Sequence, residues 1–243
     1  MTMSSLPPDH LVQYIGGEFT ETGREFLNHF KELGQLKPNH HVLDVGSGVG
    51  RMAMPLTNYL SKDGAYHGFD LSKEGIDWSN AEIASKYDTF TFTHVDLFNP
   101  LYNPSGTLQA SSFAFPYEDN SFDFVFLTSI FTHLLEQELE HYTAEISRVL
   151  KKGGRCLMTF FIVNEESAQL IHAGQSSQPF FHANGISLVV LPDAPNAAVA
   201  YPEDWVSALL TRHGLKQESI HYGSWCGRTT FTSYQDIIIV EKS

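Results

Sequence analysis

A glycine-rich turn with acidic residues on both sides is the part of this sequence best suited to binding a ligand. Residues 44–50 read Asp-Val-Gly-Ser-Gly-Val-Gly and lie between a predicted strand and a predicted helix. Glycines leave room for a ligand close to the backbone, and the amides at a helix start favour a carboxylate. Asp70 ends the next predicted strand, 20 residues after Gly50, where an aspartate can accept the hydroxyl protons of a ribose. The turn and the aspartate together predict a nucleoside-containing ligand.

The spacing of the glycines separates two kinds of nucleotide ligand. Gly46, Gly48 and Gly50 follow the pattern Gly-x-Gly-x-Gly, and Arg51 occupies the place of the third glycine in the dinucleotide fingerprint. Asp44 adds a negative charge, which suits an ammonium group better than a pyrophosphate. A structural turn without a ligand is the alternative, but the position of Asp70 would then be a coincidence.

His133 is the best candidate for a general base. It follows a predicted strand at 122–127, where substrates approach a sheet of this kind. Histidine titrates near neutrality, so it could take a proton from a hydroxyl group. The alternative is a structural histidine bonded to a loop carbonyl.

Two loops carry candidate substrate-binding residues. Trp225 and Arg228 join the last two predicted strands, where an indole could stack on a ring and a guanidinium could bind an anionic group. A hairpin loop with a packing tryptophan is the alternative. Tyr102 lies in a polar insertion at 97–115 that could form a lid, or could be a surface loop without a role.

The elements that must position these residues alternate between strand and helix. Predicted strands cover 41–45, 65–69, 90–95, 122–127, 155–163, 215–222 and 234–240, and predicted helices cover 21–33, 50–60, 72–86, 136–150 and 203–213. This order predicts an α/β fold with a parallel sheet covered on both faces. The last two strands have no helix between them, so their tight pairing predicts an antiparallel strand.

Four motifs in this order resemble those of class I S-adenosylmethionine-dependent methyltransferases, of the broad type that includes the ubiquinone and menaquinone-biosynthesis enzymes. The motifs are residues 42–51, 68–72, 115–123 and 145–154. Lys152 departs from the pattern, which usually has proline there. The resemblance covers roughly residues 34–163 and implies a Rossmann-like, doubly wound, seven-stranded sheet that is mostly parallel with an antiparallel last strand.

The resemblance also implies which residues bind S-adenosylmethionine. They come from the first two motifs and from the segment after the fourth strand: Asp44, Gly46, Ser47, Gly48, Gly50, Arg51, Asp70, Leu71 and Thr128. The turn would line the methionine end, and Asp70 would hold the ribose. Leu71 would pack near the adenine, and the Thr128 backbone would lie beside the methionine moiety.

The contact to the adenine has two candidates, Asp96 at the end of the third strand or the returning segment 110–113. We favour Asp96, with Ser112 nearby. Gly16 and Gly17 precede the first long helix, in an N-terminal segment, 1–33, that we expect to cap the cofactor; an ordinary turn is the alternative. We expect a single domain over 1–243, with insertions at 97–115 and 164–202 that shape the substrate pocket.

Composition limits the partners and the environment. The net charge is -13 with only 15 lysines and arginines, which disfavours nucleic acid and anionic membranes as partners. No apolar run approaches the roughly 18 residues that span a bilayer. The N-terminus lacks a secretory signal and the two cysteines lie in no paired motif, so we expect a cytoplasmic protein. The 12 histidines show no metal-ligand spacing, and we expect no metal.

These observations favour a methyltransferase that acts on a small molecule of unknown identity. An NAD-dependent oxidoreductase shares the strand, turn and Asp70, but the glycine spacing and Asp44 disfavour it. A non-catalytic S-adenosylmethionine-binding protein is a further alternative, because a fold does not fix a function.

Overall fold

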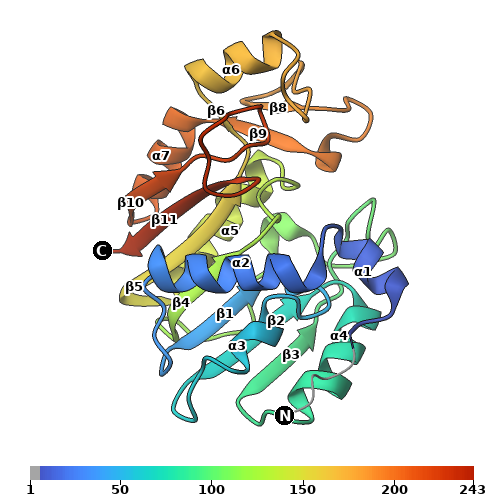
Figure 1. Ribbon diagram of the computed structural model, residues 1–243, viewed down its shortest axis with the longest axis vertical. Coiled ribbons are helices and arrows are strands. Elements are labelled where there is room, and N and C mark those ends of the chain that lie inside the picture. The colour runs from blue at the N-terminus through green and yellow to red at the C-terminus, as the bar shows by residue number, and fades with distance from the viewer. Residues whose placement is uncertain (1–5) are drawn as a thin grey trace. The chain divides into compact units, whose positions relative to one another are not determined.

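Seven strands hydrogen-bond into one sheet in the computed structural model, which describes residues 6–243 (Figure 1). In chain order they are β1 (His41–Val45), β2 (Ala65–Asp70), β3 (Phe90–His94), β4 (Phe122–Leu127), β5 (Leu150–Phe160), β10 (Leu215–His221) and β11 (Asp236–Lys242). Their order in the sheet is β10-β11-β5-β4-β1-β2-β3. β1 pairs in parallel with β2 and β4, and β2 with β3, whereas β11 is antiparallel to β5 and β10. The predicted α/β fold with an antiparallel last strand is confirmed.

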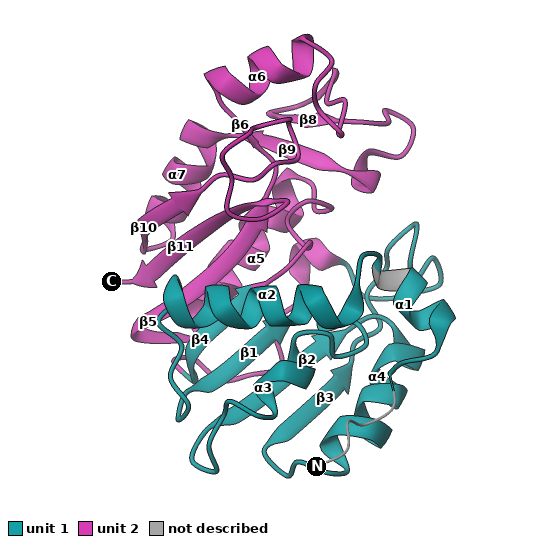
Figure 2. Cartoon of the chain, viewed as in Figure 1, with its two compact units in different colours: residues 1–109, 121–126 teal, residues 110–120, 127–243 magenta. Residues whose placement is uncertain are grey.

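The chain divides into two compact units (Figure 2). The first contains the chain through Gln109 together with 121–126, and the second contains 110–120 and 127–243. That 1–243 forms a single domain stays a prediction.

The helices of the first unit pack aromatic side chains against its strands. They are α1 (Asp9–Ile15), α2 (Phe19–Glu32), α3 (Ala53–Leu56) and α4 (Lys73–Ser79), which continues as a π-helical turn, Asn80–Ala84. The ring of Phe30 on α2 is fully buried and stacks on Phe126 of β4, with 4.3 Å between the ring centroids. The first long helix is therefore held to the sheet by the apolar spacing that predicts it.

Two predicted helices of this unit differ from the structure. The predicted helix at 50–60 is reduced to the four residues of α3, because Gly50 has a φ of 72° and Pro55 has no backbone N–H to donate. The predicted helix at 72–86 begins as expected, since the Ser72 hydroxyl accepts a hydrogen bond from the Gly75 N–H at 3.2 Å, but its α-helical part ends at Ser79 and a π-helical turn, Asn80–Ala84, follows.

The second unit contains a small sheet, of which the sequence pattern predicts only one strand, at 186–191. Its helices are α5 (Glu136–Val149), α6 (Glu165–His172) and α7 (Glu203–Arg212). The small sheet has the order β6-β9-β8-β7, formed by β6 (Ile162–Val163), β7 (His182–Asn184), β8 (Ser187–Val189) and β9 (Val199–Pro202). The predicted insertion 164–202 is thus largely structured, and the predicted strand 155–163 splits into the end of β5 and β6.

A buried carboxylate, Asp236, fixes the start of β11 and the loop that precedes it. Its oxygens accept hydrogen bonds from the backbone N–H groups of Ile162 and Gly223, both at 2.7 Å. They also accept from the indole N–H of Trp225 at 2.7 Å, and Arg228 Nη1 lies 3.2 Å away. Asp236 is 0% exposed, so these donors replace the water that the carboxylate loses on folding.

Replacing Asp236 by asparagine should strongly destabilise the second unit. An amide cannot accept from all these donors and leaves the buried Arg228 without its buried counter-charge, so we expect the free energy of unfolding to fall by about 3 kcal/mol. Urea denaturation followed by circular dichroism measures this loss. The matched control is Glu166→Gln, because Glu166 also pairs with Arg228 but its side chain is 61% exposed. The control should cost less than about 1 kcal/mol; equal losses would contradict the role of the buried carboxylate.

No helix among residues 6–243 has the length and apolar character needed to cross a membrane.

Candidate functional site

The glycine turn after β1 is tied to the end of β2 through its backbone. The N–H groups of Gly46 and Ser47 both donate to the carbonyl of Phe69 at 3.0 Å. Gly46 and Gly48 have φ values of 84° and 54°. A side chain disfavours this left-handed conformation, so glycine is required where the turn reverses.

Asp70, at the end of β2, binds the glycine turn directly. One carboxylate oxygen accepts the Gly48 N–H at 2.8 Å, and the other accepts the Ser72 N–H at 2.7 Å. Burial raises the pKa of Asp70, and these two backbone hydrogen bonds oppose that rise. The structure therefore brings together the two features whose spacing predicts a nucleoside site, and it leaves lone pairs on both oxygens for a ligand's hydroxyl groups.

Two buried polar atoms beside this turn have no hydrogen-bond partner among the described residues, 6–243. Asp44 is 1% exposed; its Oδ2 accepts the Tyr66 hydroxyl at 2.6 Å, whereas its Oδ1 has no hydrogen-bond partner among residues 6–243. The hydroxyl oxygen of Ser47 is also buried and also has no hydrogen-bond partner among residues 6–243. Unsatisfied buried polar atoms are rare and costly, so these two, like Ser79 Oγ and Thr132 Oγ1, are candidates for contact with a ligand.

The charge state of Asp44 depends on what binds beside it. Its pKa is raised to about 8, chiefly by burial and also by the charge of Asp70, while the Tyr66 hydrogen bond and the charge of Arg51 oppose this rise. A cationic group placed against this carboxyl would favour the ionised form.

The N-terminal segment lies against the glycine turn. Arg51, directly after the turn, donates from Nη1 to the carbonyl of Gly16 at 2.6 Å. Leu11 of α1 packs in an apolar cluster with Phe19 and Val49. Gly17 is also close, because a Cβ built on it would lie 3.5 Å from Arg51 Nη1. The structure thus places Gly16 and Gly17 beside the turn; their contact with a cofactor stays a prediction.

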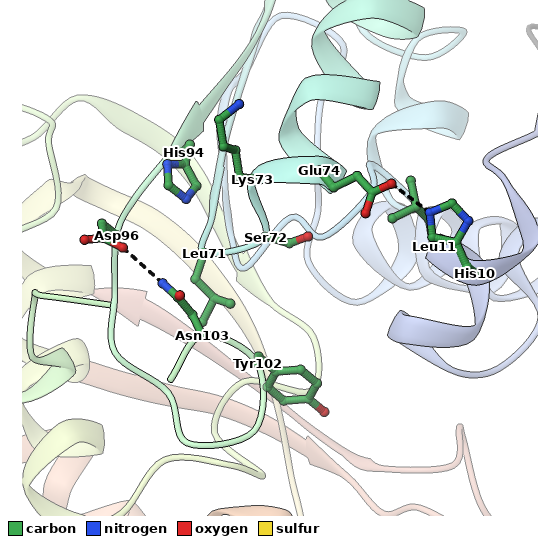
Figure 3. A pocket seen from close by; sticks show the side chains of 10 residues that line it. All are labelled: His10, Leu11, Leu71, Ser72, Lys73, Glu74, His94, Asp96, Tyr102 and Asn103. Carbon is green, nitrogen blue, oxygen red and sulfur yellow. Dashed lines mark hydrogen bonds and ion pairs between the residues drawn. The ribbon is translucent and has the colours of Figure 1, made fainter. Parts of the chain in front are cut away.

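A cavity of about 440 Å³ opens beside the ends of β2 and β3 (Figure 3). Leu71 and Leu11 supply apolar walls, and His94, Asp96 and Tyr102 supply polar and aromatic ones. This volume is within the range of small-molecule sites. Leu71 and Asp96 are the residues expected near an adenine, and they share the cavity. Tyr102, expected near the substrate, lines the same cavity.

Asp96 also organises the loop that carries Tyr102. Its Oδ2 accepts the Thr107 hydroxyl at 2.8 Å, and its Oδ1 accepts the Asn103 side-chain amide at 3.1 Å. These hydrogen bonds hold the pKa of Asp96 below its usual value. The sequence pattern points to Asn103 only as a member of a polar insertion that could form a lid, and it does not identify Thr107 or His94, because their contacts depend on the folded loop.

The remaining candidates lie in the second unit. Ser112 ends a short 3-10 helix, Ala110–Ser112, and Thr128 directly follows β4. His133 Nδ1 lies 2.9 Å from the carbonyl oxygen of Asn196, the contact expected of a structural histidine. Burial lowers the pKa of His133, so the neutral form is favoured near pH 7. Roles for Ser112, Thr128 and His133 in binding or catalysis stay predictions.

Trp225 and Arg228 are placed differently from what a substrate role requires. Trp225 is 0% exposed and packs among Phe161, Phe180 and other buried apolar residues, and Arg228 is 6% exposed. Both bind Asp236, as described above. The structure therefore agrees with the alternative of a hairpin loop with a packing tryptophan. We do not assign these two residues to substrate binding.

The described part of the chain contains no group of three or more His, Cys, Asp or Glu side chains that could hold a metal ion.

Comparison with known proteins agrees with this geometry. Residues 43–158, which include the turn, Asp70, Asp96 and Tyr102, match the family model described as a methyltransferase domain. This match and the fold are consistent with a class I S-adenosylmethionine-dependent methyltransferase. Gly16, Gly17 and the Trp225 loop lie outside the matched segment.

Relatives of this methyltransferase domain act on different acceptors. The chain is 27% identical over 137 residues to phosphoethanolamine N-methyltransferase 2 of Caenorhabditis elegans, covering 56% of this chain and 27% of the relative. It is 24% identical over 183 residues to a tRNA N(3)-cytidine methyltransferase of Gallus gallus, covering 74% of this chain and 44% of the relative. The chain thus spans less than half the length of these curated relatives.

Among solved structures, the fold is similar to 1,6-didemethyltoxoflavin-N1-methyltransferase of Burkholderia thailandensis, which holds S-adenosylhomocysteine. The TM-score is 0.60 at 15% identity, covering 97% of this chain and 83% of that one.

The hydrogen bond from Arg51 to Gly16 should stabilise the N-terminal segment over the methyltransferase turn. Arg51→Ala removes the donor, so we expect the backbone amides of α1 to exchange with deuterium roughly tenfold faster. Hydrogen exchange followed by mass spectrometry measures this rate. Arg24→Ala is the control, since Arg24 is an exposed arginine of α2 that pairs with Glu21. Unchanged exchange of α1 in Arg51→Ala would show that this contact does not hold the segment.

Proposed function

We propose that this protein transfers a methyl group from S-adenosylmethionine to a small-molecule acceptor. The observation that carries the proposal is a pair of buried atoms, Asp44 Oδ1 and Ser47 Oγ, that have no hydrogen-bond partner in the described part of the chain and lie beside a glycine turn that Asp70 binds. These atoms fit an amino-acid moiety next to a ribose. When bound, S-adenosylmethionine supplies a methyl group already activated on a sulfonium, so the protein's task is mainly to bind and align.

Each part of the cofactor has a counterpart in the first unit. Asp44 offers a carboxylate to the ammonium group, and Ser47 offers a hydroxyl to the same amino-acid end. Asp70 offers its free lone pairs to the ribose hydroxyls. The cavity lined by Leu71 and Tyr102 offers apolar and aromatic surface to the adenine.

In this proposal, Asp96 acts mainly through the loop that carries Tyr102 and less by direct contact with the adenine. Its carboxylate already accepts from Thr107 and Asn103, which leaves it less acceptor capacity for an adenine amino group. We therefore propose that Asp96 acts on the adenine chiefly by shaping the loop that brings Tyr102 into the cavity. The proposal also includes a contact of the Thr128 backbone with the methionine moiety and places Ser112 near the adenine.

A small-molecule acceptor is favoured over a nucleic acid. The net charge of -13 and the 15 lysines and arginines offer little to a phosphate backbone. The relatives that act on phosphoethanolamine and on 1,6-didemethyltoxoflavin support this choice, whereas the relative that acts on tRNA supports the alternative.

Binding and transfer experiments separate these functions. Calorimetry should show saturable binding of S-adenosylmethionine and S-adenosylhomocysteine and none of NAD. Incubation with methyl-labelled cofactor should then label a component of a small-molecule extract but not bulk tRNA. NAD binding without S-adenosylmethionine binding would favour the oxidoreductase, and cofactor binding without any transfer would favour a non-catalytic protein. Labelling of tRNA would contradict the small-molecule acceptor.

The affinity for S-adenosylhomocysteine should rise with pH between 6 and 8. Because the pKa of Asp44 in the free protein is about 8, this carboxyl is mostly protonated at pH 6 and must lose its proton to bind an ammonium group. The affinity should therefore increase by up to about tenfold per pH unit and level off near pH 8. Calorimetry across this range measures the slope.

Asp44→Asn is the informative variant for this pH dependence. It cannot ionise, so its weaker binding should lose most of the slope, whereas a substitution of the exposed Asp88 by asparagine should keep it. A slope that is the same in wild type and Asp44→Asn would show that another group controls the binding.

A further inference from the structure

The ring of Tyr66 is fixed in the interior of the first unit. Tyr66 lies near the start of β2 and is 0% exposed. Its ring stacks on Phe90 of β3, with 5.0 Å between the ring centroids, and the ring centroid of Phe92 lies 5.3 Å away. Close packing of this kind restricts the orientation of the ring, and with it the position of the hydroxyl group. No predicted motif includes Tyr66, because the motif around Asp70 begins at residue 68.

The hydroxyl of Tyr66 donates a hydrogen bond to Asp44 of the neighbouring strand. Tyr66 Oη lies 2.6 Å from Asp44 Oδ2, a distance typical of a hydroxyl bonded to an ionised acceptor. Gly68, which pairs in register with Asp44, leaves space for this contact. A Cβ built on Gly68 would lie 2.9 Å from the Tyr66 hydroxyl and 3.0 Å from Ser47 Oγ. The two hydroxyls therefore converge on one small space, which a side chain at position 68 would fill.

The hydrogen bond from Tyr66 makes the two oxygens of Asp44 unequal. Oδ2 accepts the hydroxyl proton, whereas Oδ1 is buried and has no partner among residues 6–243. When the carboxyl is neutral, we expect its own proton on Oδ1, because a proton on Oδ2 would compete with the Tyr66 donor. Oδ1 is thus the oxygen that gains or loses the proton, and it is also the one that still lacks a partner.

The other charges near Asp44 come from two elements. Asp70, at the end of β2, raises the pKa of Asp44, and Arg51, after the glycine turn, lowers it. The Tyr66 hydrogen bond lowers this pKa more than Arg51 does, and burial opposes both. His94 acts one step away, since its charge lowers the pKa of Asp70. A change at Tyr66 should therefore alter the ionisation of Asp44 while all these charges stay in place.

We propose that Tyr66 is a positioning residue that couples cofactor binding to the release of a proton from Asp44. Its hydroxyl holds Oδ2, so that Oδ1 carries the proton in the free protein and meets the ammonium group in the complex. The O–H bond of the neutral carboxyl breaks, the proton leaves to solvent, and carboxylate and ammonium remain as an ion pair. This inference rests on the proposed function, because it takes the amino-acid end of S-adenosylmethionine as the ligand of Asp44.

Proton release on binding tests this coupling in the full chain. Calorimetry in buffers of different protonation enthalpy counts the protons released when S-adenosylhomocysteine binds. Because the pKa of Asp44 is about 8, the wild type should release roughly half a proton at pH 8. Tyr66→Phe keeps the ring but lacks the donor, so the pKa of Asp44 rises and the release at pH 8 should approach one proton. Its affinity at pH 7 should fall roughly five- to tenfold.

Two further measurements separate this coupling from a loss of structure. The ligand 5′-methylthioadenosine carries the nucleoside without the amino-acid group. Wild type and Tyr66→Phe should bind it with similar affinity and without proton release. An NMR titration of the Asp44 carboxyl carbon in the ligand-free protein should show a higher midpoint in Tyr66→Phe than in the wild type.

Tyr59→Phe is the matched control. Tyr59 Oη donates to the carbonyl of Leu36 at 2.6 Å in the same unit, so this variant loses a hydrogen bond of the same length. It should release as many protons as the wild type. Should Tyr66→Phe not fold, a ring-fluorinated tyrosine at position 66 serves instead. It keeps the hydroxyl and makes it a stronger donor, so proton release at pH 8 should fall below the wild-type value.

Equal proton release by the wild type and by the Tyr66 variants would overturn the inference. An effect of Tyr59→Phe as large as that of Tyr66→Phe would also overturn it, because a general loss of stability would then account for both. If the wild type binds neither ligand, the proposed function itself fails, and this inference fails with it. Wild-type binding of S-adenosylhomocysteine with proton release that does not depend on Tyr66 contradicts this inference alone.

Discussion

The carboxylate of Asp70 is the group on which the candidate site depends. Its two oxygens accept backbone N–H groups from Gly48 in the glycine turn and from Ser72 at the start of α4. One side chain therefore fixes the end of β2, the turn after β1 and the first turn of a helix. Both donors are backbone N–H groups, so the identity of the side chains at Gly48 and Ser72 does not enter these two hydrogen bonds. The unpartnered atoms of Asp44 and Ser47 can be held in place without a ligand because this frame is already closed.

The parts of the fold that follow local rules were predictable from the sequence. Strand β4 matches its predicted range, since a short run of apolar residues bounded by polar ones is typical of a buried strand. The glycine turn and Asp70 were predictable because both depend on spacing along the chain. Of the small sheet in the second unit, only the strand at 186–191 was predictable, since its strands are only two to four residues long and β6 pairs with β9 far along the chain. Short strands carry too little periodicity to be recognised.

Side-chain roles were harder to predict than elements, for a physical reason. Tryptophan and arginine bind ligands and also fill protein interiors, and the residue type is the same in both cases. Trp225 and Arg228 were interpreted as substrate contacts, but Asp236 draws both into the interior of the second unit. Asp236 is close to Trp225 in the sequence, but only the burial of its carboxylate shows that Trp225 and Arg228 serve packing rather than substrate binding. His94 illustrates the reverse case, a residue with no motif around it that faces the cavity.

The loop after β3 is closed by its own hydrogen bonds. The backbone of Asp96 accepts from the N–H groups of Thr107 and Leu108, and its side chain binds Thr107 and Asn103, so both ends of the loop meet at one residue. A loop closed in this way transmits little of a change at its tip to the strands beneath. Residues such as Leu101 and Tyr102 can therefore vary, and the loop can lengthen or shorten between its fixed ends, at little cost to the sheet. This arrangement makes the segment an exchangeable part, which can change in sequence and length while the frame around Asp70 stays constant.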